Sequence, residues 1–114
     1  MTDVAYKIIS ADEWRVAVAE GLYTGSEVDL QDGYIHMSTE SQLAETARRH
    51  YAGRDDLMLL TVDLSGLSDD LVWEPSRGGA LFPHLYAPLR VSAVTARQRL
   101  SVSNDGGMSL EETT

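Results

Sequence analysis

The sequence predicts one small α+β domain, with two helices packed on a twisted, mainly antiparallel sheet. Two segments with helix-capping spacing alternate with strand-like segments, and several further strands follow the second of them. The 114 residues are 43% apolar, which suits one domain with a modest core. Residues 1–102 form this domain in the prediction. Residues 103–114 are polar and glycine-containing, so we expect a disordered C-terminal tail.

The first part of the chain predicts a strand, a helix and a loop. A strand is expected from Val4 to Ile9, where β-forming residues alternate. Ser10 and Glu13 have the spacing of a capping box, which predicts a helix over residues 11–20. The polar stretch 22–31 predicts a loop.

A second strand–helix pair follows. Asp32–Gly33 predicts a tight turn, because glycine tolerates the positive φ of such turns, and residues 34–37 predict the strand after it. Thr39 and Gln42 repeat the capping-box spacing, so a helix is expected from about residue 40 to residue 51.

The second half of the chain predicts strands alone. Residues 57–64 form a nearly continuous apolar run, which is typical of a central strand covered on both faces. Residues 71–74 predict a short strand that Pro75 stops, and residues 81–86 are expected to be extended. Residues 94–102 alternate cleanly and predict a half-exposed strand.

Charge and composition argue against several classes of function. The formal net charge of −9 leaves no broad electrostatic footprint for nucleic acid. No apolar run approaches the length of a membrane span, and the N-terminus does not have the build of a signal peptide, so we expect a cytoplasmic protein without membrane contact. Three histidines without repeated spacing and no cysteine make a metal site unexpected.

The segment Asp32 to Thr39 carries the strongest signal for a binding pocket. Alternate side chains of a strand share a face, so His36 and Ser38 are expected to point the same way. Ser38 and Thr39 then stand where a helix begins, and a helix N-terminus suits a phosphate. The alternative is structural: His36 is a half-buried histidine bonded to backbone, and one of the two hydroxyls only caps the helix.

A second candidate segment runs from Arg77 to Tyr86. Phe82, His84 and Tyr86 share a face if the chain is extended, and two aromatic rings beside an imidazole can stack on a planar base. Upstream, Gly79 lets backbone approach a ligand and Arg77 can fork a phosphate. The alternative is an aromatic edge of the core.

Glu74 ends a predicted strand just before Pro75. Its carboxylate can orient a ribose or stabilise a developing oxocarbenium charge, and we assign it, with His36, a catalytic role. An ion pair between Glu74 and Arg77 is the alternative.

These residues resemble a bacterial family of uncharacterised proteins, the "domain of unknown function 952". The matching pieces span about residues 4 to 95 and comprise Tyr6-Lys7-Ile8, Trp14, Asp29, the segment 32–39, Trp73-Glu-Pro-Ser-Arg77 and Phe82-Pro-His-Leu-Tyr86. The resemblance implies a family without an established reaction.

A more distant resemblance concerns the segment Tyr34-Ile-His-Met-Ser38 and the strand that follows the next helix. It is similar to the middle of RNA 2′-phosphotransferases, whose motif there is His-x-His-x-Ser; His36 and Ser38 match, and Tyr34 replaces the first histidine. The first-strand His-Gly-Thr motif of that superfamily is missing. This resemblance implies the ADP-ribosyltransferase-like fold and NAD as cofactor.

Three functions follow as hypotheses. The leading one is an enzyme that binds NAD or a related nucleotide and acts as an ADP-ribosyl or phosphate transferase or a glycohydrolase. The second is a nucleotide-sensing module without chemistry. The third is a protein-interaction module that uses the edge from Phe82 to Tyr86. The sequence predicts neither the substrate nor the oligomeric state.

Overall fold

The computed structural model describes residues 3–76 and 79–112, which form three α-helices and three antiparallel sheets. In chain order the elements are β1 (Val4–Ser10), α1 (Ala11–Glu20), β2 (Leu22–Tyr23), α2 (Glu27–Asp32), β3 (Ile35–His36), α3 (Glu40–Tyr51), β4 (Leu57–Asp63), β5 (Leu71–Ser76), β6 (Ala80–Leu85), β7 (Leu89–Arg90), the 3-10 turn η1 (Val91–Ala93), β8 (Val94–Val102) and β9 (Met108–Glu112). The predicted α+β class in one domain is confirmed.

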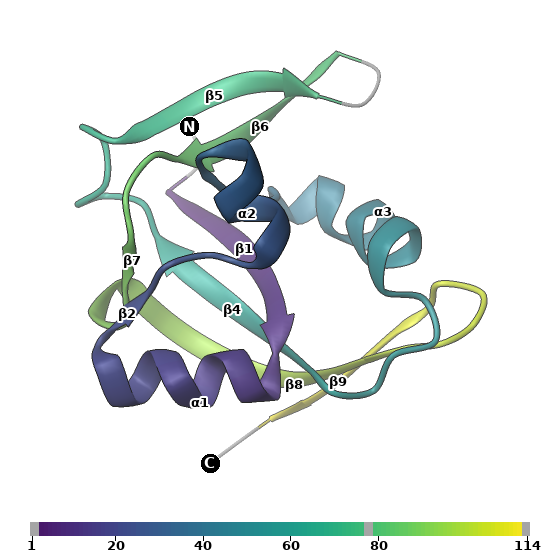
Figure 1. The fold of residues 1–114 in the computed structure, drawn as a ribbon. Coiled ribbons are helices and arrows are strands. Elements are labelled where there is room, and N and C mark those ends of the chain that lie inside the picture. The colour runs from purple at the N-terminus through teal and green to yellow at the C-terminus, as the bar shows by residue number, and fades with distance from the viewer. Residues whose placement is uncertain (1–2, 77–78, 113–114) are drawn as a thin grey trace.

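The largest sheet has the strand order β1-β4-β8-β9 and lies between α1 and α3 (Figure 1). Alternate side chains of its central strand β4 pack into two different cores. Met58 and Leu60 pack in one core cluster with Trp14 of α1, whereas Leu57 and Leu59 pack in the other with α3. Because both faces of β4 are covered, its sequence reads as an unbroken apolar run.

Helices α1 and α3 form where their sequences predict them. Ser10 caps α1: its hydroxyl accepts from the N–H of Glu13, whose carboxylate accepts from the N–H of Ser10. Gly21 ends α1 in the left-handed conformation, with φ of 80°. Thr39 is the N-cap of α3, and its N–H donates to Oε1 of Gln42 over 3.0 Å.

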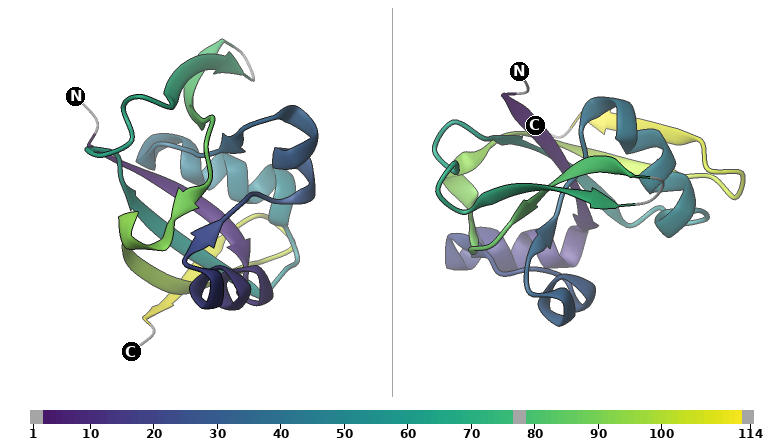
Figure 2. Two further views of the ribbon diagram at one scale, coloured as in Figure 1. Left: turned by 60° about the vertical axis from the view of Figure 1, so that its left-hand side comes forward. Right: turned by 90° about the horizontal axis from the view of Figure 1, so that it is seen from above.

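The small sheet β3-β6-β5 lies on the opposite side of the molecule from α1 (Figures 1 and 2). Two backbone hydrogen bonds between Tyr6 and Ser38 join the start of β1 to the end of the β3 segment. The side chains of Ile35 and Leu85 pack into the core cluster of α1. The small sheet is thereby fixed against the large one.

The predicted loop over residues 22–31 is wrong in part, because it contains strand β2 and helix α2. Strand β2 pairs with β7, a partner that no local pattern reveals. In α2, Ser26 and Asp29 form a third capping box. Gly33 is the left-handed residue that ends α2, with φ of 89°, so the predicted turn at Asp32–Gly33 is the end of a helix. The described part of the chain therefore contains three α-helices instead of the predicted two.

The predicted C-terminal tail is also corrected. Residues 108–112 form β9, which pairs with β8 in register from Gln98 opposite Glu112 to Val102 opposite Met108. The loop before it is fixed by Asp105 and Gly107, which bond to Ser103. The polar composition of residues 103–112 reflects an edge strand and its hairpin turn, whose hydrogen bonds come from β8.

Pro75 does not stop β5, which continues to Ser76 with Pro75 opposite Leu81. β5 is the edge of its sheet, and an edge strand tolerates a residue without an N–H. None of the helices in the described residues combines the length and apolarity needed to cross a membrane.

Candidate functional site

One face of the small sheet carries rings and carboxylates. His36 of β3 lies opposite His84 of β6, and Glu74 of β5 lies opposite Phe82 of β6. The pair next to the histidines is Ile35 opposite Leu85. Because successive residues alternate, the apolar pair faces the core and the histidine pair faces away from it. The register alone therefore brings together two histidines that are 48 positions apart.

We call this group the Tyr–His cluster; it comprises Tyr34, His36, Glu74, His84 and Tyr86. The ring of Tyr34 lies at its centre, stacked on His84 with 4.1 Å between ring centroids. Tyr34 is also 4.6 Å from the ring of His36 and 5.1 Å from that of Tyr86. The two imidazole centroids are 5.5 Å apart.

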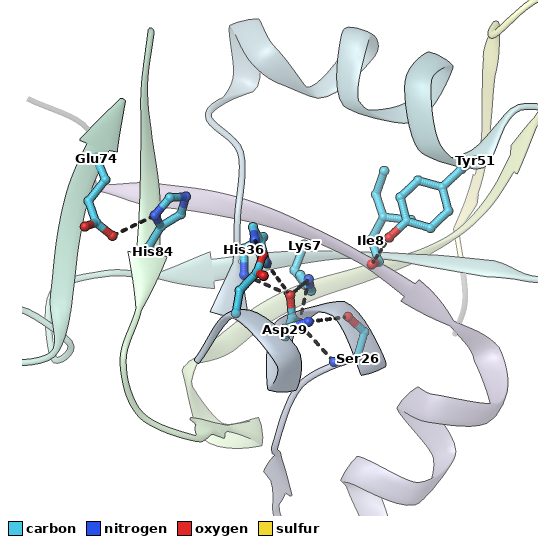
Figure 3. Close-up of polar contacts among 9 residues, drawn as sticks. Lys7, Ile8, Ser26, Asp29, His36, Tyr51, Glu74 and His84 are labelled. Atoms are coloured by element: carbon cyan, nitrogen blue, oxygen red, sulfur yellow. Dashed lines mark hydrogen bonds and ion pairs between the residues drawn. The ribbon is translucent and has the colours of Figure 1, made fainter. Parts of the chain in front are cut away.

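Glu74 holds one side of the cluster (Figure 3). Its Oε1 accepts from the hydroxyl of Tyr86 over 2.6 Å and lies 2.8 Å from Nδ1 of His84. A carboxylate only accepts, so Nδ1 of His84 carries a proton. The bonds from Tyr86 and His84 lower the pKa of Glu74, and the bond to Glu74 raises the pKa of Tyr86 to about 12.

Asp29 contacts the cluster from its buried side. This buried carboxylate is 3.0 Å from the ammonium of the buried Lys7, and its Oδ1 accepts from the backbone N–H of His36 over 3.1 Å. Its Oδ2 accepts from the N–H of Ser26. Burial acts to raise the pKa of Asp29, but the bond from His36 and the charge of Lys7 outweigh it and hold this pKa well below its ordinary value. Burial lowers the pKa of Lys7, and Asp29 opposes that shift.

His36 lies between two carboxylates. Its Nδ1 is 2.6 Å from Oδ1 of Asp29, on the buried side, and its Nε2 is 3.0 Å from Oδ2 of the partly exposed Asp32. Figure 3 shows the ring of His36 directed at Asp29. The bond to Asp29 fixes the orientation of the ring and leaves Nε2 as the nitrogen on the exposed side.

The local sequence explains how Asp29 reaches this position. Ser26-x-x-Asp29 starts α2, and the six-residue helix ends at Gly33, where the chain reverses into β3. The reversal returns the chain past the first turn of α2, so the backbone and ring of His36 meet Asp29. One carboxylate thus caps a helix, pairs with Lys7 and orients a histidine.

Of the predicted site residues, four meet in the cluster: His36, Glu74, His84 and Tyr86. The alternative of a wholly backbone-bonded histidine does not hold for His36 or His84, since both rings contact carboxylates. Tyr86 is 45% exposed, whereas His84 is buried.

Two of the remaining predicted residues, Ser38 and Thr39, lie at helix α3. The hydroxyl of the buried Ser38 is 2.9 Å from that of Thr46 in α3, and Thr39 caps the same helix and lines a hollow beside Tyr6. Phe82 is buried, on the same face of the sheet as Glu74. Gly79 is exposed with φ of 89°. Arg77 lies outside the described residues.

Sequence reasoning missed Tyr34, Asp29 and Lys7. The capping-box spacing of Ser26 and Asp29 was available as a signal for α2. No sequence signal indicated that Lys7 is buried, because an alternating strand does not show which of its charged side chains faces the core. Among the described residues, no group of histidine and acidic side chains is arranged to hold a metal ion.

The comparisons with known proteins agree with this fold. The sequence profile of the family described as "Protein of unknown function (DUF952)" matches residues 8–97, most of the chain. The chain belongs to the DUF952 family. A search of the curated proteins finds no match.

Solved structures of a protein from Caulobacter crescentus, CC0527, resemble this DUF952 chain closely. Its crystal structure is 49% identical in sequence, covers 93% of both chains and has a TM-score of 0.88. Its solution NMR structure is 50% identical, covers 92% of this chain and 90% of the other, and has a TM-score of 0.81. At this identity, the architecture described above is shared with CC0527.

Proposed function

We propose that the Tyr–His cluster is the site of an enzyme that binds NAD or a related nucleotide and cleaves or transfers at the nicotinamide–ribose bond. The observation that carries the proposal is the 2.6 Å contact of His36 with Asp29. His36 is held on its buried side by this carboxylate, and its Nε2 contacts the partly exposed carboxylate of Asp32 over 3.0 Å. The Asp32–His36 pair has the arrangement of an acid–base group in which Asp32 accepts the proton. The distant resemblance to the ADP-ribosyltransferase-like fold supplies the substrate class.

The proposed reaction replaces the N-glycosidic bond of the nucleotide by a bond from the ribose to an oxygen nucleophile. The N-glycosidic bond breaks and its electron pair leaves with the nicotinamide nitrogen, so positive charge develops on the ribose. The partly exposed carboxylate of Glu74 stabilises this charge. Water or an acceptor hydroxyl forms the new bond to the ribose carbon, and its proton passes to the carboxylate of Asp32, which Nε2 of His36 contacts. Asp29 positions the ring of His36, and the ring in turn orients Asp32.

The rest of the nucleotide has a proposed place as well. The hydroxyl of Thr39 and the N-terminus of α3 suit the diphosphate, since a helix N-terminus favours an anion. Arg77 and Gly79, which lie between β5 and β6 in the sequence, are the proposed second contact. Ser38 would act by fixing this segment, because its hydroxyl already contacts Thr46.

Two measurements test the proposal. The melting temperature is recorded with millimolar NAD or ADP-ribose, and nicotinamide release is followed chromatographically. A ligand at 100 times its Kd adds about 2.7 kcal/mol, which raises the melting temperature of a domain this size by several degrees. His36→Ala should abolish nicotinamide release and keep the fold. The control Glu111→Gln, on β9, should release nicotinamide as fast as the wild type. Absence of a shift with either ligand contradicts the proposal.

A second candidate is a nucleotide-binding module without chemistry. It is favoured by Tyr34, which stands where the phosphotransferase motif has its first histidine and covers His84 by stacking. This candidate predicts a saturable shift in melting temperature with NAD and no nicotinamide release after long incubation at high protein concentration.

A further inference from the structure

Helix α2 buries an acidic residue and exposes its two apolar ones. Asp29 is buried because Lys7 and the N–H of Ser26 hold its carboxylate, whereas Val28 and Leu30 are 58% and 65% exposed. Successive helix residues point about 100° apart, so an inward Asp29 turns both of its neighbours away from the core. The outer side of α2 is therefore apolar, and water is a poor environment for it.

A hollow of about 300 Å³ lies beside α1. Its lining includes Glu13, Val16, Ala17 and Glu20, whose spacing places them on one side of the helix. Residues 22–25 line the rest of the hollow. Val16 and Leu22 are both exposed there, so the hollow presents apolar side chains next to carboxylates.

Exposed apolar side chains are concentrated in this part of the chain. The described residues contain ten large exposed apolar side chains, and half of them lie within residues 16–30; we call these five the α1–α2 surface: Val16, Val18, Leu22, Val28 and Leu30. Both helices lie on the side of the molecule away from α3 (Figure 2, right). Single exposed apolar residues are ordinary, whereas a concentration over two helices and the strand between them indicates an interaction surface.

The charge around the α1–α2 surface is negative. Residues 11–32 contain one basic residue, Arg15, which pairs with Asp12, and six acidic ones: Asp12, Glu13, Glu20, Glu27, Asp29 and Asp32. Glu20 lines the hollow in the last turn of α1, where no basic residue balances the helix dipole. Neither Glu20 nor Glu27 has an ion pair within the described part of the chain, and both are exposed. An apolar group with a positive charge beside it therefore complements this surface.

We propose that the α1–α2 surface binds a basic amphipathic segment of a partner protein, with an apolar side chain in the hollow and a lysine or arginine at Glu20. A small molecule in the hollow would leave Val28 and Leu30 exposed. A second copy is disfavoured, because two chains with a net charge of −9 would bring acidic surfaces together. None of the five residues belongs to the Tyr–His cluster, so the inference is independent of the proposed function.

The test uses two synthetic peptides of about three helical turns, each with leucine on one face. One peptide has lysine on the other face, and its counterpart has glutamate at the same positions. Each is titrated into the isotope-labelled full-length chain and followed by the backbone amide signals in NMR. The lysine peptide should bind at least about tenfold more tightly and should shift the amide signals of residues 16–30 most. Equal affinities, or no binding of the lysine peptide, overturn the proposal.

Variants separate this surface from the general negative charge of the chain. Leu30→Ser removes an exposed apolar side chain and Glu20→Gln removes a charge at the hollow, so each should weaken binding of the lysine peptide several-fold. Leu110→Ser and Glu111→Gln make the same changes on β9 and should leave the affinity unchanged. All four positions are exposed, so the variants keep the fold. Equal losses in the variants and their controls contradict the inference.

Sedimentation of the chain without peptide tests the other occupant. A monomer is the expected result. A dimer that Leu30→Ser dissociates would show that a second copy covers the α1–α2 surface, and would overturn the proposal.

Discussion

Asp29 is the residue on which most of the site depends. Its carboxylate is buried, yet it stays ionised because Lys7, His36 and the N–H of Ser26 all meet its two oxygens. Removing one partner of a buried pair leaves the other charge without compensation, which is far more costly than removing both.

The first prediction is a double-mutant cycle on this pair. Asp29→Asn should lower the free energy of unfolding by about 3–5 kcal/mol, because Lys7 is left buried without a counter-charge. The double variant Lys7→Met with Asp29→Asn should lose clearly less than the sum of the single variants. Urea denaturation at pH 7 measures all four proteins, and strict additivity would contradict the coupling.

The same pair predicts a dependence of stability on pH. The pKa of Asp29 is lower in the folded than in the unfolded state, so its contribution is complete above the unfolded-state value of about 3.9 and is lost as the pH falls toward the folded-state pKa. The stability difference between the wild type and Asp29→Asn should therefore shrink as the pH falls below 4. Urea midpoints of both proteins at a series of acidic pH values test this, and a constant difference would argue against it.

Glu74 and Tyr86 predict a change at alkaline pH. Because Glu74 accepts from its hydroxyl, Tyr86 has a pKa raised to about 12, and the bond is lost as the pH rises through that value. Glu74→Gln should bring the pKa of Tyr86 down toward the ordinary value of about 10. The difference in ultraviolet absorbance between each protein and its Tyr86→Phe counterpart isolates this titration; an unchanged midpoint would remove Glu74 as the cause.

At the scale of elements, the hairpin of β8 and β9 is held against α3. A Cβ added to Gly106 would lie 2.4 Å from Cγ of Arg48, and the φ of Gly106 is +94°. The turn thus combines a left-handed backbone with close packing on a helix, which explains how a polar, glycine-containing segment becomes ordered.

Gly106→Ala tests this contact against a matched control. Gly21→Ala also places a side chain at positive φ, but nothing lies within 4 Å of its Cβ, so it should lose only the backbone strain of about 1–2 kcal/mol. Gly106→Ala should lose more, and amide exchange in β9 should accelerate. Equal losses in the two variants would show that the hairpin does not pack tightly on Arg48.

At the scale of the whole molecule, the two cores share the central strand β4. Leu57 and Leu59 belong to one core, Met58 and Leu60 to the other, so neither core can separate without exposing the opposite face of the same strand. A chain of this size, whose two cores share one strand, is expected to unfold in one step.

We therefore predict that unfolding curves measured by circular dichroism and by tryptophan fluorescence coincide. Trp14 is buried in the core on the α1 side, and far-ultraviolet circular dichroism reports on all helices and strands. The urea midpoints from circular dichroism and from the fluorescence of a Trp73→Phe variant, in which Trp14 is the remaining tryptophan, should agree. Two separate midpoints would mean that the cores unfold independently.

Local patterns determined much of this protein. The capping boxes at Ser10 and Thr39 and the apolar run of β4 predicted α1, α3 and the central strand, because each signal lies within a few neighbouring residues. Four residues of the Tyr–His cluster were also predicted as site residues, since histidine, glutamate and tyrosine at strand spacing indicate a polar face.

Tertiary structure decided the rest. Strands β2 and β9 exist because β7 and β8 supply their hydrogen bonds, and the bond partners lie far away in the sequence. Asp29 became the support of His36 only through the reversal at Gly33 and the burial of Lys7, which is 22 positions away. Neither the register that sets His36 opposite His84 nor the burial of a lone lysine is encoded in a local pattern. Such long-range pairing is fixed by how the sheets pack.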